Sequence, residues 1–221
     1  MIHYLQPLIQ KGTHRTYQSG STIYYQGEVP RSAAILVEGV VRVYGISSSG
    51  TEQDVTYHVG GEFFPSSWIF TKSNSTLFFY SALTDCTIVL IDKDSLLNYF
   101  SDTAHTSKAL LEYFTTSYSA SLLRINALEQ PKARDKILYT LYYLCMRYGK
   151  DTHSSSVVTV PIPLTHQNIA NLVGLTRETT ATELSRLKKE KVISYNQKNY
   201  TVYLRVLLEL IGEESFEGIN I

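Results

Sequence analysis

Residues 164–193 read LTHQNIANLVGLTRETTATELSRLKKEKVI, and this stretch decides the fold of the second half of the chain. It holds two helical periods separated by Gly174. Thr165 offers a hydroxyl that can cap the first helix. Apolar residues then follow at the spacing of one helix face, namely Ile169, Leu172 and Val173. Because glycine adopts positive φ at little cost, Gly174 suits a tight turn, and a helix, a turn and a second helix are predicted.

The second helix begins after Thr176, a capping residue, and Glu178 lies in the first turn, where the helix dipole favours an anion. The helical period directs Thr180, Leu184 and Leu187 inward and leaves outward Arg177, Glu178, Ala181 and Thr182. An outward polar face is typical of a helix-turn-helix whose second helix enters a DNA major groove. The alternative is an ordinary helical hairpin in a core. The cap directly before Arg-Glu and the basic run 186–191 favour DNA binding.

Charge is divided unevenly along the 221 residues, although the formal net charge is zero. Residues 1–130 hold 8 Lys+Arg and 11 Asp+Glu, whereas residues 131–211 hold 12 and 6. A mildly acidic first part followed by a basic second part fits a sensor joined to a DNA-binding module. The chain has no run of 18 apolar residues and no basic-then-apolar signal sequence. We therefore expect a cytoplasmic protein with no membrane partner.

The only two cysteines are Cys86 and Cys145. Two thiols cannot form a disulfide framework or a four-thiolate metal site, and they fit a reducing cytoplasm. Both are expected to be buried thiols. No metal site and no cofactor are evident in the sequence.

Short β-forming segments separated by glycine turns fill the first part of the chain. They lie within residues 17–28, 34–37, 40–44, 53–59, 77–82 and 87–91. Many short strands at regular spacing predict a β-barrel or jelly roll. Residues 1–16 are expected to form a short helix and a lead-in, and residues 94–99 another short helix.

A long helix is predicted over residues 106–128. Its apolar positions recur at a spacing of three or four, at Leu111, Phe114, Tyr118, Ser121 or Leu122, Ile125 and Leu128. This repeat fits a dimer seam. The alternative is packing against the chain's own barrel, but a barrel and a small helical domain leave so long a helix without cover. Pro131 ends the helix, so we predict a sensor domain over 1–130 and a DNA-binding domain over 131–221.

The remaining segments complete a winged module. A helix is expected over 132–148 and is ended by Gly149. A polar loop over 151–156 and a strand over 157–160 precede the helix-turn-helix. Two strands, 192–194 and 200–204, then flank a polar turn, a wing whose tip carries Lys198, and residues 207–212 close the domain. The expected fold class is α+β: an N-terminal jelly-roll barrel, a long dimerisation helix and a C-terminal winged helix-turn-helix.

Three stretches resemble one family. Residues 20–28 (GSTIYYQGE) with 36–43 (LVEGVVRV) are similar to the barrel signature of the Crp/Fnr superfamily of bacterial transcription regulators. Residues 133–141 (ARDKILYTL) resemble the family's first DNA-domain helix, and residues 167–187 its helix-turn-helix. The resemblance covers almost the whole chain. It implies a homodimeric DNA-binding regulator or activator with an inverted-repeat operator, an effector sensed by the barrel, and RNA polymerase as a partner.

The resemblance also implies the DNA-reading residues. Family members use an Arg or similar residue, a Glu and a later Arg; Arg177 and Glu178 match the first two, and Thr182 stands in the third place. Arginine can bond bidentately to guanine, and glutamate can accept from cytosine. We expect the DNA interface to comprise Thr165, His166, Gln167, Thr176, Arg177, Glu178, Thr179, Thr182, Arg186, Lys189 and Lys198. For the lysine-rich end of this second helix, the alternative to DNA contact is a face exposed only to solvent.

The barrel departs from the cyclic-AMP branch of the family. Pro65 and Ser66 replace the Gly-Glu pair that binds ribose, and Tyr80 replaces the Arg that binds the cyclic phosphate. A cyclic phosphate needs a cation or several amides to offset its lost hydration. The effector is therefore expected not to be cyclic AMP. If the barrel takes another small molecule, the expected pocket is Phe63, Phe64, Ser66, Ser67, Tyr80, Ser81, Tyr118 and Leu122.

Other chemistries fit less well. The oxygen-sensing branch holds an iron–sulfur cluster through several cysteines, and two are too few. His58 could be proposed as a haem ligand, but a lone strand histidine is more often structural. A cupin-like metalloenzyme needs a cluster of His and Glu, which is lacking, so no enzyme is expected. An effector-independent interaction module is a further alternative. The two readings are distinguished by whether residues 131–221 shift a DNA fragment in a binding assay.

Overall fold

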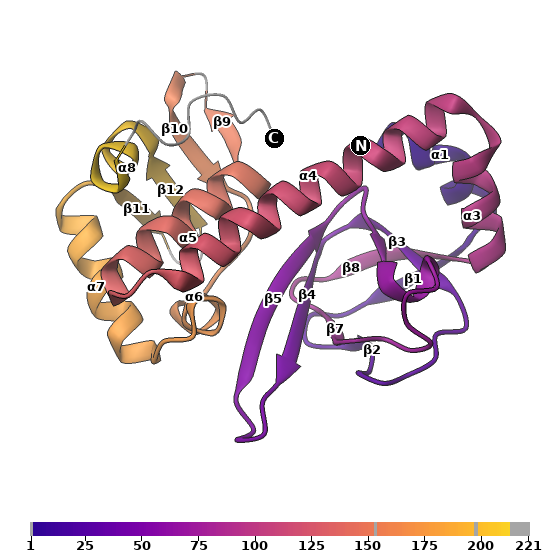
Figure 1. Ribbon diagram of the computed structural model, residues 1–221, viewed down its shortest axis with the longest axis horizontal. Helices are drawn as coiled ribbons and strands as arrows, with labels where there is room; N and C mark the ends of the chain where they lie inside the picture. The colour runs from indigo at the N-terminus through magenta and orange to yellow at the C-terminus, as the bar shows by residue number, and fades with distance from the viewer. Residues whose placement is uncertain (1, 153, 197–198, 213–221) are drawn as a thin grey trace. The chain divides into compact units, whose positions relative to one another are not determined.

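The computed structural model describes residues 2–152, 154–196 and 199–212 (Figure 1). The chain divides into two units, and the division falls between Glu112 and Tyr113. This point lies inside helix α4 (Ala104–Glu129) and not at residue 130, where the sequence predicted the domain boundary. The C-terminal half of α4 belongs to the second unit. One of its contacts there is with α5, where the Lys136 side chain donates to the Leu128 carbonyl at 2.7 Å.

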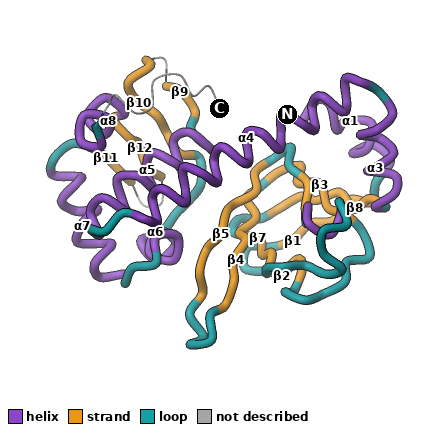
Figure 2. The backbone as a smooth tube through the Cα atoms, in the orientation of Figure 1, coloured by secondary structure: helices purple, strands orange, loops and turns teal. Residues whose placement is uncertain are grey.

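Two antiparallel sheets form the centre of the first unit. Its strands are β1 (Thr13–Tyr17), β2 (Thr22–Tyr24), β3 (Ala33–Glu38), β4 (Val40–Ile46), β5 (Glu52–Val59), β6 (Phe63–Phe64), β7 (Phe79–Ala82) and β8 (Cys86–Ile91). One sheet has the order β1-β8-β3-β6 and the other β2-β7-β4-β5. Its helices are α1 (Ile2–Lys11), α2 (Ser66–Ile69) and α3 (Lys93–Asp102). Figure 2 shows the loops that join these strands.

One core fills the space between the two sheets. It combines side chains of the first sheet, such as Leu36 and Ile88, with side chains of the second, such as Val41 and Val43. Along β4, buried valines alternate with the half-buried Arg42 and Tyr44, because successive residues of a strand point to opposite faces. The predicted jelly-roll architecture is confirmed.

Strand β1 was not expected, since residues 1–16 were predicted to be a helix and a lead-in. Four of its five residues are exposed, so it lacks the apolar alternation that marks a strand. It is a strand because its backbone pairs with β8, from Thr13 opposite Leu90 to Tyr17 opposite Cys86. The short elements β6 and α2 were likewise not predicted.

The second unit surrounds helix α5 (Ala133–Tyr148). Its other elements are β9 (Lys150–Thr152), β10 (Ser154–Val160), α6 (His166–Val173), α7 (Arg177–Lys189), β11 (Ile193–Asn196), β12 (Asn199–Tyr203) and α8 (Leu204–Ile211). The strands form one sheet in the order β11-β12-β10-β9. The predicted helix-turn-helix with a two-stranded wing is therefore confirmed. No helix in the described part of the chain has the length and apolar character needed to cross a membrane.

The polar loop predicted over 151–156 was wrong. Thr159 pairs with Lys150 and Val158 with Asp151, so β9 extends the sheet as an edge strand. Backbone pairing defines this strand, and its polar sequence carries no apolar period. Close packing at the end of α5 also explains why residue 149 is a glycine, although its φ of −60° is open to any residue. An added Cβ there would lie 2.2 Å from the Cys145 oxygen and 2.4 Å from Val158 Cγ1.

Candidate nucleic-acid interface

Helix α6 begins and ends at the residues that the sequence indicated. The Thr165 hydroxyl accepts from the Asn168 amide at 3.1 Å, and the Asn168 side chain accepts from the Thr165 amide at 2.9 Å. This reciprocal pair is a capping box. Gly174 follows with φ +68°, the left-handed conformation that glycine adopts without strain. The predicted cap and turn are confirmed, and they set where α7 starts.

Helix α7 presents one buried face and one exposed face. Thr180, Leu184 and Leu187 are fully buried. On the opposite side Arg177, Glu178 and Thr182 are exposed, and Ala181 is half-buried. The direction in which each of these residues points was predicted from the period, and it is confirmed. The N-terminal half of α7 therefore offers a cation and an anion side by side at its surface.

Three threonines along α7 use their hydroxyls within the helix. The Thr176 hydroxyl accepts from the Thr179 amide at 3.2 Å and caps the first turn. The Thr179 hydroxyl lies 3.0 Å from that of Thr176. One turn later, the Thr182 hydroxyl donates to the Glu178 carbonyl at 2.9 Å. Thr182 therefore presents mainly its methyl group outward.

Two predicted contacts lie at the start of α6. Gln167 is exposed, and its amide donates to the Asn171 side chain at 2.7 Å. The half-buried ring of His166 meets the Tyr195 ring edge-on, with 5.6 Å between the centroids. Burial, and secondly the charge of Arg177, lower the pKa of His166 below its ordinary value of 6.5. The imidazole is consequently neutral at pH 7 in the protein without DNA.

The basic end of α7 divides into paired and exposed cations. Arg186 donates to Glu183 at 2.5 Å, although its side chain is 61% exposed. Lys189 is exposed. Lys188, which was not among the predicted contacts, places its ammonium 4.3 Å from the centre of the Tyr195 ring. The sequence marked Lys188 only as part of a basic run. The predicted wing-tip contact Lys198 lies outside the described residues.

An ion pair ties the C-terminal end of α7 to the start of α5. Arg134 donates to both carboxylate oxygens of Glu190, at 3.0 and 2.5 Å. The pair raises the pKa of Arg134 and lowers that of Glu190. Because both side chains are partly exposed, the ion pair stabilises the fold by at most about 1 kcal/mol. Its fork geometry nevertheless restrains the direction of α7.

Inside the barrel, three rings lie parallel. The His58 ring stacks on Phe64 at 5.0 Å, and Phe64 stacks on Tyr80 at 5.2 Å. His58 Nδ1 lies 2.6 Å from a carboxylate oxygen of the buried Glu62. The described part of the core cluster that includes Phe64 and Tyr80 contains no Lys or Arg. Burial raises the pKa of Tyr80, so its phenol stays neutral.

The residues predicted for an effector pocket are only partly brought together. Phe64 and Tyr80 share the barrel core, whereas the Phe63 ring packs against Phe70 and Phe100, with its centroid 5.2 Å from that of Phe100. Phe63 therefore points away from that core. The half-buried serines are Ser66 and Ser67, in the short helix α2, and Ser81, on the strand face opposite Tyr80. Tyr118 and Leu122 belong to the second unit.

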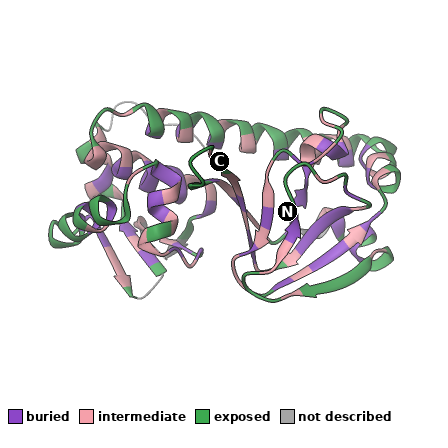
Figure 3. Cartoon of the chain, turned by 90° about the horizontal axis from the view of Figure 1, so that it is seen from below, coloured by how far each residue is buried: buried purple, intermediate pink, exposed green. Residues whose placement is uncertain are grey.

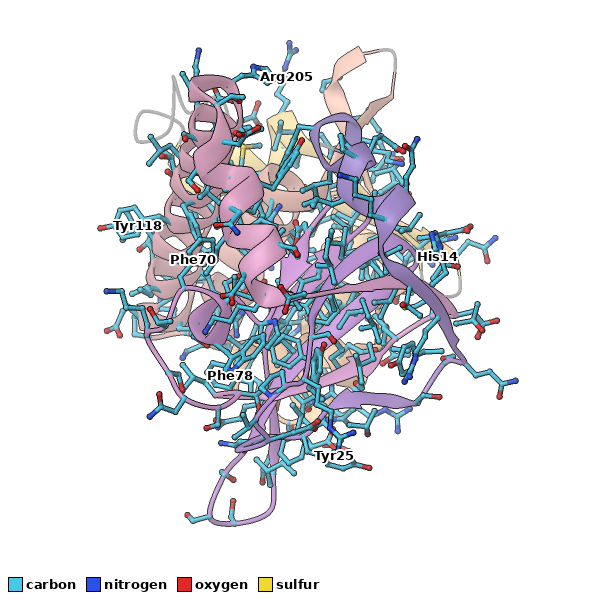
Figure 4. The ribbon with its side chains drawn as sticks, turned by 90° about the vertical axis from the view of Figure 1, so that its right-hand side faces the viewer. His14, Tyr25, Phe70, Phe78, Tyr118 and Arg205 are labelled. Atoms are coloured by element: carbon cyan, nitrogen blue, oxygen red, sulfur yellow. The ribbon has the colours of Figure 1, made fainter. Side chains whose placement is uncertain are left out.

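Helix α4 has two unlike faces (Figure 3). Ala120, Leu123 and Ala127 are buried. The predicted seam residues are all exposed: Leu111 at 67%, Phe114 at 36%, Tyr118 at 65%, Ile125 at 55% and Leu128 at 36%, together with Ser121 and Leu122. Figure 4 shows the Tyr118 ring projecting away from the helix. No residue in the described part of the chain covers this apolar stripe enough to bury it.

A barrel of the cyclic-nucleotide-binding type joined to a winged helix-turn-helix defines a class of DNA-binding regulators. The family model of the cyclic nucleotide-binding domain matches residues 14–103, and that of the Crp-like helix-turn-helix domain matches residues 135–211. The chain belongs to the Crp/Fnr family of transcriptional regulators. Regulators of this family bind DNA and are dimeric.

Individual proteins support this assignment. The transcriptional activator protein FnrL of Cereibacter sphaeroides is 27% identical over 98% of this chain and 88% of its own length. The nitrogen fixation regulation protein FixK of Rhizobium meliloti is 26% identical over 87% of this chain and 84% of its own. The structure of FixK2 from Bradyrhizobium japonicum shares the fold with a TM-score of 0.72, at 20% identity, over 90% of this chain and 96% of that one. These comparisons support a regulator over a metalloenzyme.

Proposed function

We propose that the chain is a homodimeric regulator that recognises an inverted-repeat DNA operator through α7. The observation that carries the proposal is the exposure of Arg177 and Glu178 on the outer face of a capped helix whose inner face is fully buried. An arginine in the major groove bonds to guanine, and a glutamate accepts from the amino group of cytosine. The two residues together would specify one or two base pairs of each half-site.

Phosphate contacts would hold α7 in register. Exposed candidates are Gln167 at the start of α6, and Arg186 and Lys189 at the far end of α7. Such contacts fix position and orientation without distinguishing sequences. The half-buried His166 would join them once it is protonated.

The exposed stripe on α4 is the proposed dimer seam. Six apolar side chains recur along it at a spacing of three or four, from Leu111 to Leu128. Burying them against a second copy would remove a row of large apolar groups from water, which is the main driving force for helix association. A twofold dimer would then place two α7 helices in successive major grooves, about 34 Å apart.

The proposed effector is not cyclic AMP. A core with neither Lys nor Arg among its described members and with a neutral Tyr80 offers no charge to a cyclic phosphate. The paired His58 and Glu62 support a structural part for that histidine. The proposal assigns no metal or prosthetic group to the chain.

RNA polymerase is the proposed protein partner, and activation is the proposed mode of action. FnrL, similar over nearly the whole chain, is described as a transcriptional activator. A regulator of this kind would act in the bacterial cytoplasm, where the chromosome lies.

Selection of bound sequences from random duplex DNA by the purified full chain tests the proposal. We expect an inverted repeat with half-sites one helical turn apart, each containing a base pair whose preference is lost in Arg177→Ala. That loss should cost about 1–3 kcal/mol per half-site. A matched control is Arg147→Ala, on α5, which removes an arginine beside Tyr148 and should leave the motif unchanged. Enrichment of no motif, or of one without twofold symmetry, would overturn the proposal.

A further inference from the structure

A single arginine connects α4 to the helix-turn-helix within the second unit. The Arg124 Nη2 atom donates to the Leu172 carbonyl at 3.0 Å, between residues 48 positions apart in the sequence. Leu172 lies in the last turn of α6, where carbonyl groups lack partners within the helix. The C-terminal end of a helix also carries partial negative charge, which favours a cation. Arg124 therefore binds the end of α6, two residues before the Gly174 turn that leads into α7.

The same guanidinium contacts α5. Its central carbon lies 5.9 Å from the centre of the Tyr143 ring, within the range of a cation–π contact. Tyr143 is itself held in place, because it is 2% exposed and its hydroxyl lies 3.2 Å from that of Tyr148. Arg124 thus joins three helices at one point, reaching from α4 to both α5 and α6.

The position of Arg124 on α4 gives this contact its importance. Its sequence neighbours Leu123 and Ala127 are buried, whereas Leu122 and Ile125 belong to the exposed apolar stripe. One helix turn therefore carries seam residues on one face and the link to the helix-turn-helix on another. A rotation or shift of this turn would be transmitted to α6 through this hydrogen bond from a charged donor.

We propose that Arg124 is a positioning residue that fixes the angle of the helix-turn-helix on α4 and thereby sets the separation of the two α7 helices in the dimer. The inference rests on the proposed function, since it needs an inverted-repeat operator. Arg124 acts through α6 and does not contact DNA. Lysine would not replace it fully, because only arginine offers a planar fork that bonds a carbonyl and covers an aromatic ring together.

Operators of altered spacing test the inference. Dissociation constants are measured for the selected operator and for versions with one base pair inserted or removed between the half-sites. For wild type, changed spacing should weaken binding strongly. For Arg124→Ala, affinity for the selected operator should fall about tenfold, and the penalty for changed spacing should shrink, with the half-site motif and the dimer unchanged. Arg124→Lys should lie between the two.

The control is Arg147→Gln, which removes another guanidinium lying over a tyrosine, 5.1 Å from the centre of the Tyr148 ring. It should retain the wild-type spacing penalty. If the circular dichroism spectrum shows that Arg124→Ala is not folded like the wild type, the spacing penalty of Arg124→Lys is used to test the inference. A wild-type spacing penalty in a folded Arg124 variant would overturn the inference. Failure of the wild type to bind any inverted repeat would instead overturn the proposed function.

Discussion

Thr182 stands at the position of α7 where the resemblance to the family places a DNA-reading arginine. Its hydroxyl donates to the Glu178 carbonyl, so the side chain offers DNA a methyl group where the resemblance places an arginine. A methyl group can contact thymine but cannot bond bidentately to guanine. The two groups beside it, Arg177 and Glu178, remain exposed for base contact.

The change Thr182→Arg should therefore move the selected motif toward the family's usual half-site. A new arginine on the same face would add one guanine contact, worth about 1–3 kcal/mol of discrimination at that base pair. Thr182→Val, which removes the hydroxyl but keeps the shape, is the matched control and should keep the wild-type motif. Sequencing of DNA selected by all three proteins decides the matter. Identical motifs for wild type and Thr182→Arg would show that α7 is placed differently in the groove.

His166 should make operator binding depend on pH. Burial and Arg177 lower its pKa in the free protein, whereas a phosphate oxygen beside it would raise its pKa in the complex. DNA binding then takes up a proton at His166. The affinity for DNA should therefore rise as pH falls from the pKa in the complex to the pKa in the free protein, and it should level off below the latter. His166→Gln should remove this dependence. A wild-type affinity that depends on pH no more than that of His166→Gln would exclude a phosphate contact at His166.

At the scale of the element, α4 has one buried face and one exposed apolar face. Its buried face, with Ala120 and Ala127, packs within the second unit, and the small side chains allow close approach. Its exposed face holds large apolar groups that the described residues leave in water. In the proposed dimer, one face of this helix would support the second unit and the other would pack against a second copy.

The double variant Phe114→Glu and Ile125→Glu should be monomeric in sedimentation experiments. A carboxylate buried in an apolar seam without a partner costs several kcal/mol, whereas the same group costs little on an exposed face. Both positions are exposed in the single chain, so the monomer should keep its fold. Phe114→Leu with Ile125→Leu keeps the seam apolar and should remain dimeric. A dimer that survives both glutamates would place the interface elsewhere.

At the scale of the whole molecule, the two units differ in charge and in the way their cores are built. The first unit closes two sheets over a core that holds aromatic rings, and the second packs helices around α5. The excess of Lys and Arg lies in residues 131–211, so the charge that attracts DNA is carried by the winged module. The formal net charge of zero conceals this division.

Isothermal titration with cyclic AMP and with cyclic GMP should show no binding. The barrel core offers a stack of His58, Phe64 and Tyr80 where a cyclic phosphate would need a cation. Addition of either nucleotide should also leave the affinity for the operator unchanged. Binding in the micromolar range would show that Pro65, Ser66 and Tyr80 do not mark the loss of that site.

The sequence by itself determined the helix-turn-helix and the order of barrel, long helix and winged module. Caps at Thr165 and Thr176, the positive φ at Gly174 and the apolar period of α6 are local properties, because each depends on residues within a few positions. The exposed stripe of α4 and the jelly roll were likewise visible as periods and turns. The residues that face outward on α7 follow directly from the apolar period of α7 itself.

Only the tertiary structure decided the features that depend on residues far apart in the chain. The exposed β1 and the polar β9 are strands because neighbouring strands pair with their backbones, which no side-chain pattern records. The link from Arg124 to Leu172 joins residues 48 positions apart. The division of the chain inside α4 likewise follows from tertiary contacts, because the helix runs through it without a break. Phe63 and Phe64 are adjacent in sequence but face different neighbours, because the strand turns successive side chains to opposite sides.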